Sequence, residues 1–333
     1  MKGGRVNSVA WTNVGRSIAG IRIAPVYLVL VAVFFIGWLL VSLFGRGQFL
    51  TEASMTNTLI RAVPLGIVAV GQTIAILCRS LDLSVAYLIS VTAVMASFIM
   101  QGDPDRIPLA IFVVIVIGLV VGLTNGLIIT RLRVNPFIAT LGTGLIMQGV
   151  LSTTFQNFAG SVPREFQTLA YGTIGRFPIS VILLIIVAAI GMFILQRTRF
   201  GAHIYAVGGN REAARLSGIR TDRVIIGAHV FASLTAVASG LFIASRLRAG
   251  APWVGTDGVY DLESIAAVVI GGTALAGGRG GIAGTMVGVL IFALLETMFN
   301  QLGVGAFLKQ VLRGFIIIAA VASYSFRSKE EVG

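Results

Sequence analysis

Long apolar runs separated by short polar stretches are the main pattern of this chain. The first run, 24–44, contains 21 largely apolar residues, about the length that an α-helix needs to cross a bilayer. It is longer than the roughly 7–15 apolar residues of a signal-peptide core, so we expect it to be retained as a helix. The pattern predicts about ten membrane segments: 24–44, 57–78, 83–100, 107–130, 136–156, 178–195, 224–245, 262–276, 281–301 and 306–326.

Two of these segments differ from a simple spanning helix. Segment 57–78 contains Arg61 and Pro64, and segment 262–276 is only about 15 residues long and ends in a glycine cluster. The short segment predicts a broken or re-entrant helix, which is tolerated where protein or a water-filled cavity surrounds it. Glycines also recur every fourth residue from 118 to 126 and from 280 to 288. Such ladders favour close helix packing.

Composition narrows the fold class to an all-α polytopic membrane protein. Hydrophobic residues make up 56% of the 333 residues and charged residues 11%, whereas soluble domains carry about 25% charged residues. The mean hydropathy is +0.94. These values exclude a disordered chain, a coiled coil, a secreted disulfide scaffold and a soluble enzyme. One cysteine, Cys78, and two histidines are too few for a disulfide or a cysteine- or histidine-rich metal site.

The basic residues predict how the chain is oriented in the bilayer. The net charge is +12, but no basic run is interleaved with aromatic residues, so we expect no nucleic-acid partner. With ten crossings, 16 of the 25 Lys and Arg residues fall on the side of the N-terminus and six on the other. An excess of basic residues marks cytoplasmic loops. We therefore expect a cytoplasmic segment 1–23, one membrane domain 24–326 and a cytoplasmic tail 327–333.

Motifs for ATP hydrolysis or other catalysis do not stand out in the sequence. A P-loop ends in Gly-Lys-Ser/Thr, and none of Lys2, Lys309 and Lys329 follows a glycine. If ATP powers this chain, another subunit hydrolyses it. No HExxH motif occurs, and no Ser/His/Asp or paired-Asp arrangement stands out in the spans. We expect a chain that is not an enzyme and that binds no cofactor or metal itself.

The polar loop 197–223 contains the signals of a short helix. An asparagine is a good N-cap and a glycine a good terminator, and between them an acidic first turn and a basic last turn suit the helix dipole. A helix of two turns is marginal in water on its own. It is therefore expected to dock on a partner, the alternative being a solvated loop helix. The residues are Asn210, Arg211, Glu212, Ala213, Ala214, Arg215 and Gly218.

The turn after the second segment also carries polar residues. Asp82 is placed to cap the helix that starts near Ser84, and Ser84 adds a second acceptor. Arg79, three residues before Asp82, is within reach of an ion pair with it. The turn is either a well-capped connection or a place for gating or subunit contact.

Several polar groups fall at membrane depth, where they are costly and mark functional candidates. Glu296 and Arg313 flank a turn near Gly303 and are predicted to pair, with Lys309 nearby. The pair is either structural or part of a proton relay. His229 is interpreted as a packing residue. Five further side chains could offer hydrogen bonds to a polyol on a translocation pathway or could join helices: Gln72, Thr73, Asn125, Gln148 and Thr273.

Four long segments together resemble a known family. They are AVGQTIAI with LDLSV (69–85), GLTNGLIITRLRVNPFIATLGTGLIMQGV (122–150), RTRFGAHIYAVGGNREAARLSGI (197–219) and YDLESIAAVVIGGTALAGGRGGIAGTMVGVL (260–290). This order and spacing resembles the permease subunits of bacterial ribose-type (carbohydrate-uptake class 2) ABC importers. The sequence departs from that pattern in two places. Arg79–Ser80 replaces a usual Gly-Gly, and the late glycine segment carries Arg279 and Gly281 where a variable residue and often Ser are expected.

The resemblance implies an inner-membrane sugar importer that works by alternating access. Its partners would be a cytoplasmic ATPase subunit, which holds ATP and magnesium, a periplasmic sugar-binding protein, and a second permease copy or a paralogue. The competing hypothesis is an ion-coupled secondary transporter, for which Glu296 or Asp82 would be the titratable site. The family's segment that couples to the ATPase maps onto Gly208, Gly209, Asn210, Arg211, Glu212, Ala213, Ala214, Arg215 and Gly218.

Overall fold

The computed structural model describes residues 25–45 and 49–330. The predicted segment 1–23 lies outside the described residues, as do residues 331–333 of the predicted tail. Nine of the described helices have 17 or more residues and follow one another along the chain. They are α1 (Pro25–Phe44), α2 (Glu52–Leu77), α3 (Ser84–Met100), α4 (Ile107–Arg131), α5 (Pro136–Thr154), α7 (Ile179–Arg197), α10 (Thr221–Leu247), α13 (Ile282–Gln301) and α14 (Ala306–Glu330).

Shorter elements connect the long helices. Two strands form an antiparallel hairpin in which Thr173 pairs with Pro178 and Ile174 with Phe177. The connecting elements are the 3-10 turn η1 (Pro104–Arg106), α6 (Arg164–Tyr171), β1 (Thr173–Ile174), β2 (Phe177–Pro178), α8 (Arg199–Gly209), α9 (Arg211–Leu216), α11 (Val254–Asp257) and α12 (Tyr260–Ile270).

The predicted membrane segments correspond closely to helices. Each of the ten overlaps one helix, and seven of the described helices are long and apolar enough to cross a membrane. The second segment begins earlier than predicted, because α2 starts at Glu52 and continues through Pro64. The eighth segment is broken as predicted, since α12 ends at Ile270 and residues 271–281 form irregular backbone.

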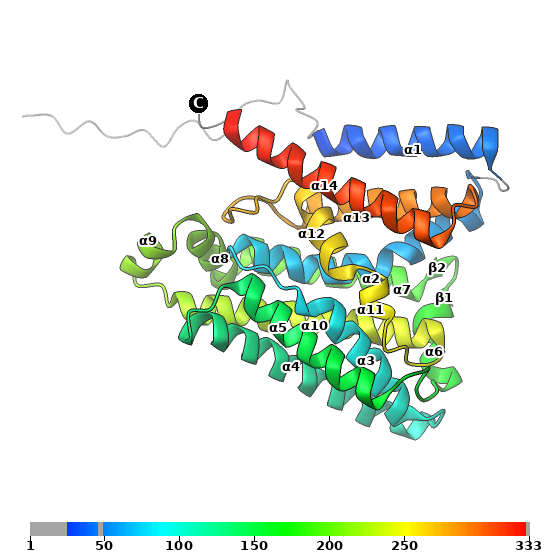
Figure 1. Ribbon diagram of the computed structural model, residues 1–333, viewed down its shortest axis with the longest axis horizontal. Coiled ribbons are helices and arrows are strands. Elements are labelled where there is room, and N and C mark those ends of the chain that lie inside the picture. The colour runs from blue at the N-terminus through cyan, green and yellow to red at the C-terminus, as the bar shows by residue number, and fades with distance from the viewer. Residues whose placement is uncertain (1–24, 46–48, 331–333) are drawn as a thin grey trace, which may run out of the picture.

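The long helices run side by side, and the connections gather at two ends (Figure 1). α8 and α9 lie at the left end of this view, together with the loops that follow α2 and α12. α6 and the β1–β2 hairpin lie at the right end. The first turn of α1 and the last turn of α14 lie at the same end as α9.

α2 and α10 form the centre of the fold. α10 packs against α2, α3 and α4, and Ile74 of α2 and Phe242 of α10 are fully buried. Glycines allow α4 to approach α10 closely, since a Cβ at Gly122 would lie 2.6 Å from the Cα of Val230. The packing role predicted for the ladder 118–126 is therefore confirmed.

The second predicted glycine ladder is only partly helical. Gly284 and Gly288 lie on α13, where an added Cβ would overlap the backbone of Gly271 and Ala267 around α12. Gly280 instead belongs to the loop before α13, with φ +125. The predicted helix-packing ladder from 280 to 288 is therefore wrong at Gly280, because the helix begins two residues later at Ile282.

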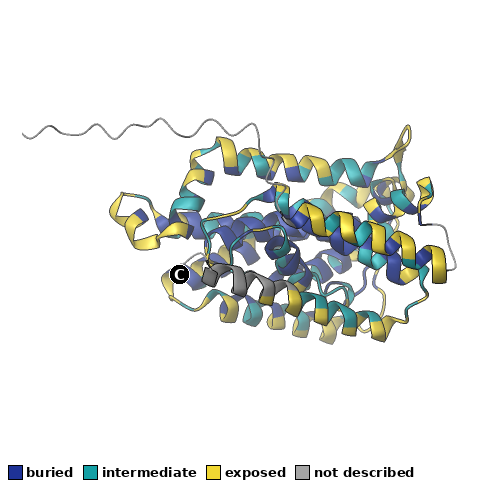
Figure 2. Ribbon diagram, turned by 90° about the horizontal axis from the view of Figure 1, so that it is seen from above, coloured by how far each residue is buried: buried dark blue, intermediate teal, exposed yellow. Residues whose placement is uncertain are grey.

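The outer faces of several helices are exposed and apolar. Large side chains such as Phe35 of α1, Phe112 of α4, Phe193 of α7 and Phe315 of α14 are more than half exposed. Figure 2 shows exposed residues along the outer helices and buried residues in the interior. Apolar surface this extensive is not typical of a soluble monomer, whereas a lipid bilayer covers it.

Candidate coupling site and buried polar networks

The short helix predicted in the polar loop is α9. Asn210 accepts hydrogen bonds from the backbone N–H groups of Glu212 and Ala213, both at 3.0 Å, so the predicted cap is confirmed. The helix ends at Leu216, and Gly218 follows with φ +84. A left-handed residue after the last turn is the usual way to end a helix.

The surface of α9 is charged and carries one large apolar side chain. Arg215 and Glu212 form an exposed ion pair at 2.7 Å, and Arg211 pairs with Asp222 at 3.0 Å. Leu216 is 80% exposed. Leu216 was not among the residues predicted for the coupling loop, although an exposed leucine on a short helix at the end of the fold suits contact with another protein.

Arg79 joins the end of α2 to the corner between α8 and α9. Its Nε donates to the carbonyl oxygen of Gly208 at 2.6 Å, and a terminal nitrogen donates to that of Gly209 at 2.8 Å. The ion pair proposed between Arg79 and Asp82 was wrong. The last carbonyls of a helix lack intrahelical partners and form the negative end of its dipole, so the end of α8 is a favourable partner for a guanidinium.

The glycine loop 271–281 meets the same corner. Gly278 N–H donates to the carbonyl oxygen of Leu77 at 3.0 Å, and the Tyr205 hydroxyl of α8 donates to that of Gly280 at 2.9 Å. Burial raises the pKa of the Tyr205 phenol, which keeps it protonated as a donor. A Cβ at Gly208 would overlap the Leu77 oxygen. Three segments distant in sequence are thus held together beside α9.

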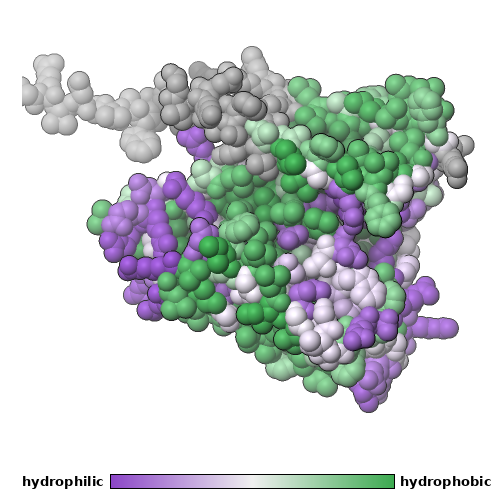
Figure 3. All heavy atoms as spheres, in the orientation of Figure 1, coloured by the Kyte–Doolittle hydropathy of each residue, from purple (hydrophilic) through white to green (hydrophobic). Residues whose placement is uncertain are grey.

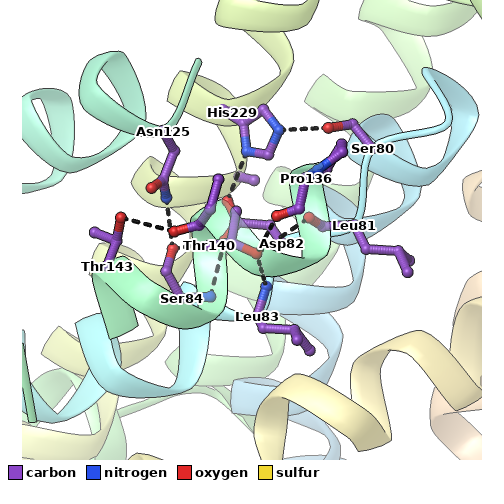
Figure 4. A network of polar contacts seen from close by, with 12 residues as sticks. Ser80, Leu81, Asp82, Leu83, Ser84, Asn125, Pro136, Thr140, Thr143 and His229 are labelled. Atoms are coloured by element: carbon purple, nitrogen blue, oxygen red, sulfur yellow. Dashed lines mark hydrogen bonds and ion pairs between the residues drawn. The ribbon is translucent and has the colours of Figure 1, made fainter. Parts of the chain in front are cut away.

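A buried polar network surrounds the turn between α2 and α3 (Figure 4). Oδ1 of Asp82 accepts from the N–H of Ser84 at 3.0 Å and from its hydroxyl at 2.5 Å. Asp82 thus accepts from the first N–H of α3, as predicted, although Leu83 occupies the N-cap position itself. Ser84 does not add a second acceptor for the helix, because its oxygen instead accepts from the amide of Asn125 at 2.9 Å. The turn is also tied to α5, since the N–H of Leu83 donates to Thr140 Oγ1 at 3.1 Å.

Asp82, His229 and Ser80 are bonded in a row. Oδ2 of Asp82 lies 3.0 Å from His229 Nδ1, and His229 Nε2 lies 2.7 Å from the Ser80 hydroxyl. A Ser/His/Asp arrangement is therefore present, contrary to the sequence analysis, which had no means of joining positions nearly 150 apart. All three residues are at most 1% exposed, so no substrate reaches them. The row locks the α2–α3 turn onto α10, and His229 is the satisfied packing residue that the sequence predicted.

The predicted pairing of Glu296 with Arg313 is confirmed. Their side chains meet at 2.7 Å, and Lys309 lies 3.6 Å from Glu296. Glu263 of α12 joins the cluster at 3.1 Å from Arg313, a partner that the sequence reasoning missed. The cluster therefore connects three helices, α12, α13 and α14.

Comparison with known proteins shows which family has a sequence similar to this chain of apolar helices. A family model described as "Branched-chain amino acid transport system / permease component" matches residues 54–321, well over half of the chain. The chain belongs to this permease family. No solved structure matches the permease.

The permease is also similar to several sugar permeases. It is 37% identical to the ribose import permease protein of Bacillus subtilis over 277 residues, which cover 82% of this chain and 85% of the relative. It is 34% identical to the ribose import permease protein of Escherichia coli K12 over 279 residues, covering 82% and 86%. The galactose/methyl galactoside import permease protein of Haemophilus influenzae is 33% identical over 298 residues, covering 84% and 88%.

The side chains suggested for a translocation pathway do not converge in the permease. Thr73 bonds to Thr285 at 2.8 Å between α2 and α13, and Thr273 accepts from the N–H of Gly281 at 3.2 Å within the glycine loop. The others lie apart: Asn125 in the Asp82 network, Gln148 on α5 beside Ser152, and Gln72 fully buried in α2 with both amide atoms lacking a partner among the described residues.

Asp82→Ala in the permease is expected to reduce stability strongly. The substitution leaves the buried groups of Ser84 and His229 without their acceptor, and each buried polar group left unsatisfied typically costs about 1–3 kcal/mol. Thermal unfolding of the detergent-solubilised protein, followed by size-exclusion chromatography, measures the effect. Asp103→Ala is the matched control, because the Asp103 side chain is partly exposed and pairs with Arg106 at the surface. Equal unfolding temperatures for the two variants would contradict a structural role of the network.

Proposed function

We propose that the permease forms the translocation pore of a bacterial sugar importer, driven through alternating access by a separate ATPase subunit. The single observation that carries the proposal is the capped, exposed helix α9, bonded through its corner to the end of α2 and to the glycine loop. The similar ribose and galactose permeases support a sugar as the solute. The family description, which names amino acids, supplies the competing solute class.

We propose ten membrane segments with both termini in the cytoplasm of the inner membrane. The common end of α1, α9 and α14 supports this arrangement (Figure 1). The end that carries α9 would then face the ATPase, which holds ATP and magnesium. The end that carries α6 and the hairpin would face a periplasmic sugar-binding protein. A second permease copy or a paralogue would complete the pore, and this chain would hold no cofactor.

The bonded contacts give a route for movement from the ATPase to the membrane. A displacement of α9 acts on Arg79 through the carbonyls of Gly208 and Gly209. Arg79 belongs to the same turn as Asp82, which is bonded to His229 of α10. Because α2 and α10 form the centre of the fold, movement at the corner would alter the packing of the central helices.

Reconstitution tests the proposed function. The permease, its co-purified ATPase and its binding protein are placed in proteoliposomes, and uptake of radiolabelled D-ribose, D-galactose and L-leucine is measured. Sugar uptake is expected only with internal ATP and all the components present. Uptake by the permease alone, driven by an ion gradient and abolished by an ionophore, would instead support the secondary transporter. Leucine uptake without sugar uptake would overturn the solute class.

A further inference from the structure

A cavity with charged and polar walls lies between α2 and α10 on one side and α11 to α14 on the other. Its volume is about 270 Å³. This is slightly below the roughly 300–1,000 Å³ of pockets that hold drug-sized ligands, so it suits a smaller molecule. The polar side chains that line it are Arg61, Arg246, Tyr260, Glu263, Glu296 and Arg313.

The polar lining offers both hydrogen-bond donors and acceptors, with donors in excess, because three guanidinium groups and a phenol face two carboxylates. Arg313 is held between the two carboxylates, at 3.1 Å from Glu263 and 2.7 Å from Glu296. In the described part of the chain, no carboxylate forms an ion pair with Arg61 or Arg246, so their guanidinium groups are not occupied in this way. Guanidinium groups only donate and carboxylates only accept.

The mixture of charges selects a class of ligand. An anion would meet two carboxylates, and a cation would meet three arginines, so each would be opposed by part of the wall. Each hydroxyl of a polyol both donates and accepts, and so it is satisfied by both kinds of group. A neutral polyhydroxylated molecule therefore fits this lining better than either ion.

The remaining walls suit the carbon skeleton of such a molecule. Phe242, Phe292 and Phe299 contribute aromatic surface to the cavity, and aromatic rings bury apolar faces efficiently. Figure 3 shows hydrophilic residues between the hydrophobic surface along α14 and a paler region around α11. Polar groups thus reach the surface of the molecule in this part of the fold.

We propose that this cavity binds one neutral polyhydroxylated solute of monosaccharide size during its passage through the permease. The inference rests on the sugar-import function proposed above and names the groups that hold the solute. It gives the Glu263–Arg313–Glu296 cluster a second use, because the ion pairs that join α12, α13 and α14 also fix the acceptors of the cavity.

Cysteine labelling tests occupancy of the cavity directly. Val254, a partly buried residue of α11, lines the cavity, whereas the native Cys78 is buried and gives little background. In membrane vesicles containing full-length Val254→Cys permease without ATP, a small polar maleimide is expected to label the new thiol. D-ribose or D-galactose is expected to slow labelling, and inorganic phosphate is not. Asp105→Cys, an exposed position on η1, is the control that no solute should protect.

Three further variants separate binding from structure. Arg246→Gln, made in the Val254→Cys chain, is expected to raise the sugar concentration for half-protection about tenfold, the effect of losing roughly one charged hydrogen bond. Lys309→Gln removes a contact to Glu296 outside the lining and should leave the half-protection concentration unchanged. Ala293→Leu, which narrows the cavity, should weaken protection by galactose more than by ribose.

The outcomes distinguish this inference from the proposed function. Absence of labelling, protection by phosphate instead of sugar, or equal effects of Arg246→Gln and Lys309→Gln would each overturn the cavity site. If the cavity site were overturned but ATP-driven sugar uptake were normal in the same preparation, the proposed function would stand without the cavity site. Failure of ATP-driven sugar uptake would overturn the proposed function, whatever the labelling shows.

Discussion

Charge reversal on α9, by Glu212→Lys together with Ala213→Glu, is expected to abolish uptake and leave membrane insertion intact. Both residues are exposed, and substitutions at such positions usually change stability by no more than about 0.5 kcal/mol. The pair that is broken, Glu212 with Arg215, is more than 60% exposed on both sides, and exposed pairs contribute about 0–1 kcal/mol. The loss therefore reports on docking and not on folding.

Uptake and ATP hydrolysis by the reconstituted importer measure the effect. A docking contact at the centre of an interface is typically worth about 2 kcal/mol or more, so uptake should fall by more than about tenfold and less ATPase should co-purify. The control is Asp103→Lys at the opposite end, where Asp103 forms a comparably exposed pair with Arg106 at 3.2 Å. Normal uptake by the double variant would refute the role of α9 as the coupling helix.

The parts of the fold that the sequence predicted are those set by local rules. An apolar run of about 20 residues is fixed by the thickness of a bilayer, so nearly every segment could be placed. The cap at Asn210 depends on the next three residues. The pair of Glu296 with Arg313 spans 17 positions across one turn, where antiparallel neighbours bring the side chains to the same depth.

The parts that the sequence did not predict depend on long-range packing. The partners of Arg79 lie about 130 positions away, and His229 lies 147 positions from Asp82. Contacts between residues so far apart in the chain leave no periodic or local signal in a single sequence. Glu263 was missed for a related reason, because only the packing of α12 against α14 brings it to Arg313. The predicted ion pair between Arg79 and Asp82 does not form. Arg79 instead donates to the carbonyl oxygens at the end of α8, and Asp82 bonds to His229.

Arg79→Ala is expected to uncouple ATP hydrolysis from transport. Arg79 donates two hydrogen bonds, to the carbonyl oxygens of Gly208 and Gly209, and these bonds link the α2–α3 turn directly to the corner beside α9. α9 keeps its Asn210 cap without Arg79, and the ATPase should still dock and hydrolyse ATP. Movement of α9 would reach the α2–α3 turn less directly once both bonds are lost, so uptake per ATP hydrolysed should fall by about tenfold or more, since one hydrogen bond to a charged group is worth roughly 1.5–3 kcal/mol.

The ratio of uptake to hydrolysis in proteoliposomes decides whether Arg79 is this link. Arg79→Lys should give an intermediate ratio, because an ammonium group donates from one point and does not span two carbonyls as a guanidinium does. Arg131→Ala, which removes an exposed arginine at the end of α4, is the matched control and should leave the ratio unchanged. An unchanged ratio in Arg79→Ala would refute the link. A parallel loss of uptake and hydrolysis would assign Arg79 to assembly with the ATPase, since a transmitting residue lowers the ratio and an assembly residue lowers both activities together.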